Sequence, residues 1–171
     1  DNVKKGLFKK DKTGATLIDL GPKLGEKILL RSDGTSVYIT QDLYLAVLKH
    51  KEYKFDKSIY IVGNEQNYHF QVLFKLLDIL KYKFAKDCYH LSYGMIFLPE
   101  GKMKSREGTV VDADNIMDDL SNLAKKEIKK RQDFPDKKVD MLAEKIGLAA
   151  LKYFLLKFSA HKDFTFNPKE S

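Results

Sequence analysis

The segment "KSIYIVGNEQNYHFQVLFKLLDILKY", residues 57–82, joins a strand pattern directly to a helical pattern. Its first part is an apolar, β-branched run that ends at Gly63, which is typical of a strand. Its second part has the spacing of one helical face, occupied by His69, Val72, Leu73, Leu76, Leu77 and Leu80. A strand followed at once by a helix is half of a parallel β–α–β unit, so the segment predicts an α/β fold.

The residues before this segment predict a hairpin, a strand and a helix. Two β-prone runs flank the turn residues 11–14, "DKTG". "KILLR", residues 27–31, is a short apolar strand, and Gly34 in the turn that follows is free to take a positive φ. We expect Thr40 to cap a helix that runs to about His50.

The residues after it predict further strands and then helices. "CYHLSYGMIFL", residues 88–98, supplies one or two strands. Asp112 or Asp114 is expected to cap a helix that runs to about Lys130, and another helix begins near Lys137. The second helix is predicted to bury one face, made of Val139, Leu142, Ala143, Ile146, Ala150 and Tyr153. The predicted fold is α/β, a partial Rossmann-like parallel sheet with C-terminal helices.

Composition limits the class of protein. The chain has 171 residues, 43% hydrophobic and 32% charged, which fits one globular domain or slightly more. A net charge of +7 favours an anionic partner such as a nucleotide or nucleic acid. The single cysteine, Cys88, excludes an internal disulfide and fits a core position in a cytoplasmic protein. No apolar run reaches the ~20 residues of a membrane span, and no signal peptide is visible.

The two ends of the sequence suggest a fragment. The first residue is Asp1 rather than methionine, and "FTFNPKES", residues 164–171, stops without a closing element. We therefore expect a longer parent protein.

Two pairs of residues could face a ligand near the end of the central strand. Ligands of open α/β sheets gather outside the carboxyl ends of the strands, and Gln66 and His69 follow Gly63 at a spacing of three. Packing of His69 within its own helix is the alternative. Tyr38 and Asp42 are four residues apart at a helix start, so a ring and a carboxylate share one face. Stabilisation of Asp42 by the helix dipole is the alternative for that pair.

A basic loop follows the last predicted strand. In "GKMKSREG", residues 101–108, Lys102, Lys104 and Arg106 alternate with Met103 and Ser105. Such cations could neutralise charge on a phosphate leaving group. The Gly-x-x-x-x-Gly-Lys-Ser/Thr pattern of a P-loop is absent. A solvated surface loop remains the alternative.

Four separated motifs together resemble the arginyl members of the class I aminoacyl-tRNA synthetases. "GKMKSREG" resembles the signature loop Lys-Met-Ser-Lys-Ser of that class. "LLRSDGTSVYITQDL", "IYIVGNEQNYHFQ", "HLSYGMIFLPEGKMKSREGTVVDAD" and the closing "FNPKES" are similar to the arginyl family in particular. The resemblance covers nearly the whole chain.

The resemblance implies a reaction and a set of site residues. Family members join arginine to ATP, giving arginyl-adenylate and pyrophosphate, and then transfer arginine to tRNA. The residues implied to contact arginine are Tyr38, Asp42 and Gln66. Those implied to bind ATP are Gly63, Glu65, His69, Met95, Lys102, Met103 and Ser105. Lys102, Lys104 and Arg106 would stabilise the departing pyrophosphate, Mg²⁺ would accompany the phosphates, and no protein metal site is implied.

The chain also departs from the family pattern. Ser105 stands where the signature has its second lysine, and no His-x-Gly-His motif is present. The resemblance implies that residues 1–112 are the second half of the nucleotide-binding catalytic domain, and that residues 113–171 lead toward a missing anticodon-binding domain. We expect the parent to be a cytoplasmic monomer without membrane association, and the chain alone to be inactive.

Two other readings of the sequence stay open. One is a non-catalytic module of the same fold that holds nucleotide or RNA. The other is a different class I synthetase. An acidic pocket formed by Tyr38, Asp42 and Gln66 would favour a synthetase for a cationic amino acid over both of these readings.

Overall fold

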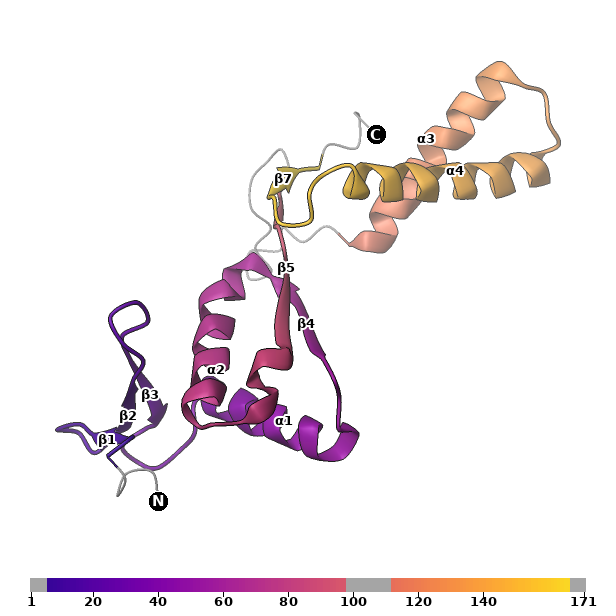
Figure 1. Cartoon of the computed structure of the whole chain (residues 1–171). Helices are drawn as coiled ribbons and strands as arrows, with labels where there is room; N and C mark the ends of the chain where they lie inside the picture. Colours follow the sequence, from indigo (N-terminus) through magenta and orange to yellow (C-terminus); the bar gives the residue numbers. More distant parts are fainter. Residues whose placement is uncertain (1–5, 98–111, 167–171) are drawn as a thin grey trace. The chain divides into compact units, whose positions relative to one another are not determined.

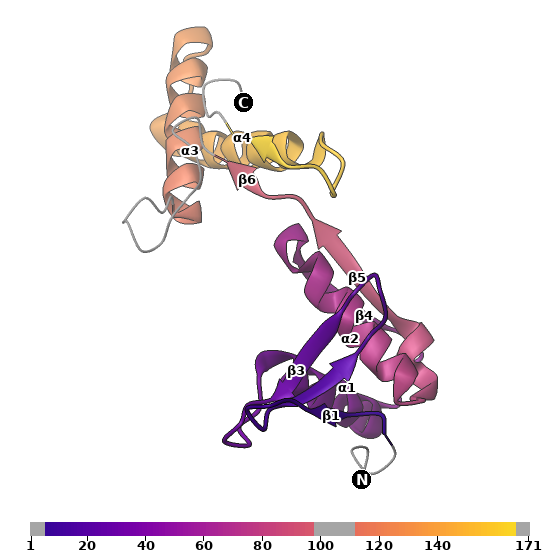
Figure 2. The same cartoon turned by 90° about the vertical axis from the view of Figure 1, so that its left-hand side faces the viewer.

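The computed structural model describes residues 6–97 and 112–166. The chain divides into two compact units, residues 1–92 and residues 93–171. Figures 1 and 2 show the elements of each unit in two views at right angles.

The first unit opens with a small antiparallel sheet. Its strands β1 (Lys9–Lys10), β2 (Thr16–Asp19) and β3 (Glu26–Leu30) lie in that order. The predicted hairpin is confirmed, and Asp11 stabilises its turn by accepting hydrogen bonds from the amides of Thr13 at 2.8 Å and Ala15 at 2.9 Å. Gly34 has a φ of +83°, as the turn after β3 predicted.

Helix α1 (Tyr38–Tyr53) follows this sheet. The prediction that Thr40 caps it is wrong, because the helix begins two residues earlier and Val37 occupies the cap position without a side-chain bond. The Thr40 hydroxyl instead donates to the Leu29 carbonyl at 2.5 Å. It thereby ties α1 to β3, and the helix extends three residues beyond the predicted end at His50.

A β–α–β unit forms the centre of this part of the chain. Strand β4 (Ser58–Gly63) leads through a short 3₁₀ turn, η1 (Asn64–Gln66), into α2 (Asn67–Ile79). A second 3₁₀ turn, η2 (Lys83–Asp87), precedes β5 (Cys88–Tyr93), which is hydrogen-bonded to β4. The predicted strand, helix and strand are confirmed, and so is the α/β class. The buried core side chains of α2 are Phe70, Val72, Leu73, Leu76 and Leu77.

Cys88 packs at the edge of this core, as predicted. Its thiol lies 3.5 Å from the Phe84 carbonyl. Burial disfavours the thiolate, and together with the neighbouring Asp87 carboxylate it raises the pKa of Cys88 to about 11.

The second unit begins with two short strands. β6 (Ile96–Phe97) and β7 (Phe164–Thr165) pair in parallel. The expectation that residues 164–171 contain no closing element is therefore wrong for Phe164–Thr165. Gly94 lies against the segment before β7, where an added Cβ would come within 2.1 Å of the Lys162 carbonyl oxygen.

Helices α3 (Ala113–Arg131) and α4 (Asp136–Leu156) form the rest of this unit. The predicted cap is confirmed, since the Asp112 carboxylate accepts from the Asp114 amide at 2.9 Å. The predicted buried face of α4 is wrong in part, because Ile146 and Tyr153 are exposed. Their neighbours Gly147 and Phe154 are buried instead.

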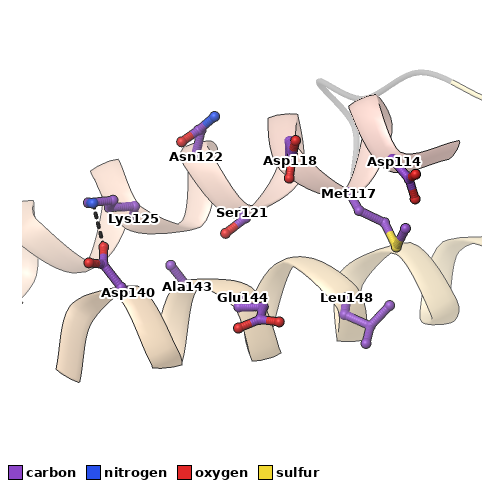
Figure 3. A pocket seen from close by; sticks show the side chains of 10 residues that line it. All are labelled: Asp114, Met117, Asp118, Ser121, Asn122, Lys125, Asp140, Ala143, Glu144 and Leu148. Atoms are coloured by element: carbon purple, nitrogen blue, oxygen red, sulfur yellow. Dashed lines mark ion pairs between the residues drawn. The ribbon is translucent and has the colours of Figure 1, made fainter. Parts of the chain in front are cut away.

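Gly147 explains that rotation of the buried face. A Cβ on Gly147 would lie 2.7 Å from the Ser121 amide nitrogen of α3, so only glycine allows the helices to approach this closely. Further along the contact, Lys125 and Asp140 form an ion pair across a pocket of about 490 Å³ (Figure 3). This pocket contains Asp114, Asp118 and Glu144 as well.

Candidate functional site

A pocket of about 400 Å³ lies in the first unit, beside the carboxyl end of β4. Its lining comes from α1, β4, η1 and α2. The lining residues are Tyr38, Asp42, Val62, Gln66, His69 and Phe70. The two pairs of residues singled out in the sequence therefore line one pocket, together with two apolar side chains that the sequence did not single out.

Helix α1 contributes the ring and the carboxylate. Tyr38 and Asp42 lie one turn apart, at the first and fifth positions of α1. The helix is held below them by the buried side chains of Ile39 and Ala46. Tyr38 is 81% exposed, so it stands at the open rim and can cover a bound ligand.

The end of β4 and the start of α2 contribute the opposite side. Gln66 closes the 3₁₀ turn after β4, and His69 is the third residue of α2. Phe70 forms an apolar wall and packs on the His90 ring of β5, with ring centroids 4.3 Å apart. Nε2 of His90 also lies 2.9 Å from the Val62 carbonyl oxygen, so the apolar wall is fixed to both strands.

A direct contact joins the two sides of the pocket. Nε2 of His69 lies 2.7 Å from Oδ2 of Asp42. The helix dipole does not account for Asp42, because its effect is confined to the first turn and Asp42 lies beyond the first turn of α1. Nor does His69 pack only within its own helix. The sequence did not predict this contact, since 27 residues separate the partners and no spacing rule relates two different helices.

The remaining residues with a predicted ATP role fall in both units. Gly63 ends β4, and Glu65 is exposed in the 3₁₀ turn between that strand and α2. Met95 belongs to the second unit, where its amide donates to Asp163 at 2.7 Å and its carbonyl accepts from the Phe164 amide at 3.1 Å.

The basic loop lies outside the described residues. This applies to five residues with a predicted role, Lys102, Met103, Lys104, Ser105 and Arg106. Their roles stay predictions.

The pocket suits an organic cation with an apolar stem. One carboxylate supplies negative charge, Gln66 supplies an amide, and the Tyr38, Val62 and Phe70 side chains supply apolar surface. Within residues 6–97 and 112–166, no group of three or more histidine, cysteine or acidic side chains is arranged to hold a metal ion. In the same residues, no helix is long and apolar enough to cross a membrane.

Comparison with known proteins identifies the family. The family model for the catalytic domain of class I tRNA synthetases (R) matches residues 1–168. The chain belongs to this family. An arginine–tRNA ligase of Bacteroides thetaiotaomicron is 53% identical to all of the chain, which spans 29% of that relative. An arginine–tRNA ligase of Treponema denticola is 54% identical over 97% of the chain, which spans 28% of that relative.

Solved structures agree with this class I tRNA synthetase fold. The arginyl-tRNA synthetase of Thermus thermophilus matches 96% of the chain with a TM-score of 0.77 at 20% identity. The enzyme of Plasmodium falciparum matches 98% of the chain with a TM-score of 0.76, also at 20% identity. The chain corresponds to 34% and 28% of those two structures. At these identities the likeness bears on the fold alone, and the resemblance inferred from the motifs is confirmed by the family match.

Proposed function

We propose that the complete protein is an ATP-dependent arginine–tRNA ligase and that this chain carries its amino-acid pocket. The enzyme would join the arginine carboxylate to the α-phosphate of ATP, releasing pyrophosphate, and would then transfer the arginyl group to tRNA. The names of the relatives support the reaction. The observation that carries the proposal for this chain is the convergence of Tyr38, Asp42 and Gln66 on one pocket.

The chemistry of the pocket favours arginine over other amino acids. A guanidinium group is planar and presents a fork of N–H donors, and a carboxylate can accept two of them. Asp42 would take this part of arginine, while the Tyr38 ring packs along the aliphatic stem. Gln66 has both a donor and an acceptor, so it can anchor either the guanidinium or the α-amino end.

ATP would bind beside the same crevice. Gly63 ends β4 and Glu65 lies in the 3₁₀ turn that follows, so both would lie on the ATP side, and the backbone near Met95 is the proposed adenine contact. Lys102, Met103 and Ser105 would contact the phosphates, and Lys102, Lys104 and Arg106 would stabilise the pyrophosphate as it leaves. This arrangement needs no covalent enzyme intermediate and no general base, because positioning and electrostatics lower the barrier.

Mg²⁺ would accompany the phosphates of ATP. The ion would be held mainly by phosphate oxygens and water, as Mg²⁺ commonly is. When bound, it would neutralise phosphate charge.

The proposal extends to the organisation of the complete protein. Residues 1–112 would be the second half of the nucleotide-binding domain, and residues 113–171 would lead to the domain that reads the anticodon. The protein would act as a cytoplasmic monomer. Because the chain lacks a His-x-Gly-His motif, it would not charge tRNA alone.

Amino-acid-dependent exchange of pyrophosphate into ATP tests the activity. With the complete protein and each of the twenty amino acids in turn, we expect exchange with arginine only. With arginine present, the complete protein should charge tRNA and the 171-residue chain should not. Exchange with a different amino acid would refute the arginine proposal in favour of a different class I synthetase. No exchange with any amino acid, with tRNA present, would refute the ligase proposal and favour a module that only binds nucleotide or RNA.

A further inference from the structure

The contact between His69 and Asp42 occupies only one oxygen of the carboxylate. Nε2 of His69 lies 2.7 Å from Oδ2. A carboxylate can only accept, so Nε2 carries the hydrogen of this bond. Within the part of the chain that the structure describes, Oδ1 of Asp42 makes no hydrogen bond. The carboxylate is therefore held at one oxygen and open at the other.

His69 is the more firmly placed of the two partners. Its helix, α2, buries five side chains in the core, whereas α1 buries two. The His69 ring also stands edge-on to Phe70, with an interplanar angle of 86°. The His69 side chain is 25% exposed and the Asp42 side chain 44%. Without the histidine, the half-exposed carboxylate of Asp42 would be free to rotate on α1.

We propose that His69 is a positioning residue for amino-acid recognition. It holds Asp42 in the orientation in which the open oxygen receives the guanidinium of arginine, in the pocket that Tyr38 and Gln66 also line. The inference rests on the proposed function and deepens it. It gives His69 a role different from the ATP contact that the family resemblance implies.

A fixed carboxylate has a specific consequence for selectivity. The guanidinium fork is directional, so its hydrogen bonds require an acceptor in a defined orientation. A lysine ammonium is a point charge with rotating donors, and it can follow a carboxylate into many orientations. Loss of His69 should therefore weaken arginine binding more than lysine binding, and the discrimination between the two should fall.

Steady-state pyrophosphate exchange by the complete protein with tRNA present tests this role, with arginine and ATP varied separately. Lysine is added as a competitor of arginine, and its inhibition constant should change less in His69→Ala than the KM for arginine. We expect His69→Ala to raise the KM for arginine about tenfold, equivalent to about 1.4 kcal/mol. The KM for ATP and the thermal unfolding temperature should stay close to wild type. His69→Gln keeps an N–H donor near the position of Nε2 and should restore most of the arginine affinity.

Two further variants separate positioning from other effects. Lys75→Ala changes a residue further along α2 that pairs with Asp78, and it should leave both KM values unchanged. In an Asp42→Asn background, His69→Ala should add little, because the group it positions has lost its charge. Independent, additive effects of the two substitutions would overturn the inference.

The outcomes distinguish this inference from the proposed function. A higher KM for ATP with an unchanged KM for arginine would overturn the positioning role and favour an ATP contact. Equal losses in His69→Ala and His69→Gln, accompanied by a lower unfolding temperature, would also overturn it, in favour of a structural role. A wild-type protein without arginine-dependent exchange would instead refute the proposed function itself.

Discussion

Gly94→Ala tests the close backbone approach in the second unit. A Cβ at this position would lie 2.1 Å from the Lys162 carbonyl oxygen and 2.6 Å from the Asp163 nitrogen. Ordinary contacts begin at 3.4 Å, so the segment around Lys162 would have to retreat by about 1.3 Å. The crowding atoms belong to the backbone, which cannot rotate away as a side chain can.

That retreat would break backbone hydrogen bonds. The Gly94 amide donates to the Ala160 carbonyl at 2.7 Å, and the Phe164 amide donates to the Met95 carbonyl at 3.1 Å. An intramolecular hydrogen bond contributes about 1 kcal/mol net, so the loss of both gives about 2 kcal/mol. We expect Gly94→Ala to destabilise the pairing of β6 and β7 by this amount.

Hydrogen exchange of the chain measures the effect locally. The amides of Phe164 and Phe166 bond across to the strand β6 region, and about 2 kcal/mol should make their exchange about thirtyfold faster. Lys162→Ala is the matched control, because it removes the side chain and leaves the crowding carbonyl in place. Equal protection of both amides in wild type and Gly94→Ala would refute the reasoning.

Three other predictions concern stability and reactivity. Gly147→Ala should lower the urea midpoint for unfolding of the α3–α4 pair. Crowding against Ser121 costs about 1–3 kcal/mol and opposes a gain of about 1 kcal/mol in helix propensity. Ala149→Gly, in the same helix, measures the propensity difference between alanine and glycine alone. Thr40→Val removes the bond from α1 to β3 and should cost about 1 kcal/mol in urea unfolding. Cys88, whose pKa is raised from 9.0 to about 11, should react slowly with a disulfide reagent at pH 8 and faster toward pH 11. Because the fold favours the neutral thiol, its contribution to stability is complete below pH 9 and is lost between pH 9 and 11.

The principal strands, helices and turns could be predicted because each depends on residues that are neighbours in the sequence. The apolar run before Gly63 predicted β4, and the helical spacing after it predicted α2. The positive φ at Gly34 was expected because glycine adopts that conformation readily in turns. The start of α1 could not be placed, because Thr40 bonds to Leu29, eleven residues back, instead of capping its own helix. A cap signal does not reveal such a competing tertiary partner.

The limits for α4 and for the site have the same origin in tertiary contacts. Gly147 shifts the buried face of α4 because α3 approaches its backbone, and periodicity alone assigned Ile146 to that face. Residue types and spacing indicated Gln66 and His69 as neighbours in one crevice. The bond from His69 to Asp42 could be found only in three dimensions, because it joins two helices.

The binding of arginine at Asp42 is the central claim, and the KM for arginine of Asp42→Asn in the complete protein tests it most directly. Because Asp42 is 44% exposed, we expect about 2 kcal/mol, less than the 3–5 kcal/mol typical of a fully buried pair. The KM for arginine should therefore rise about thirtyfold, with the KM for ATP unchanged. Asp78→Asn, on the exposed side of α2, is the matched control. An unchanged KM for arginine in Asp42→Asn would contradict the account.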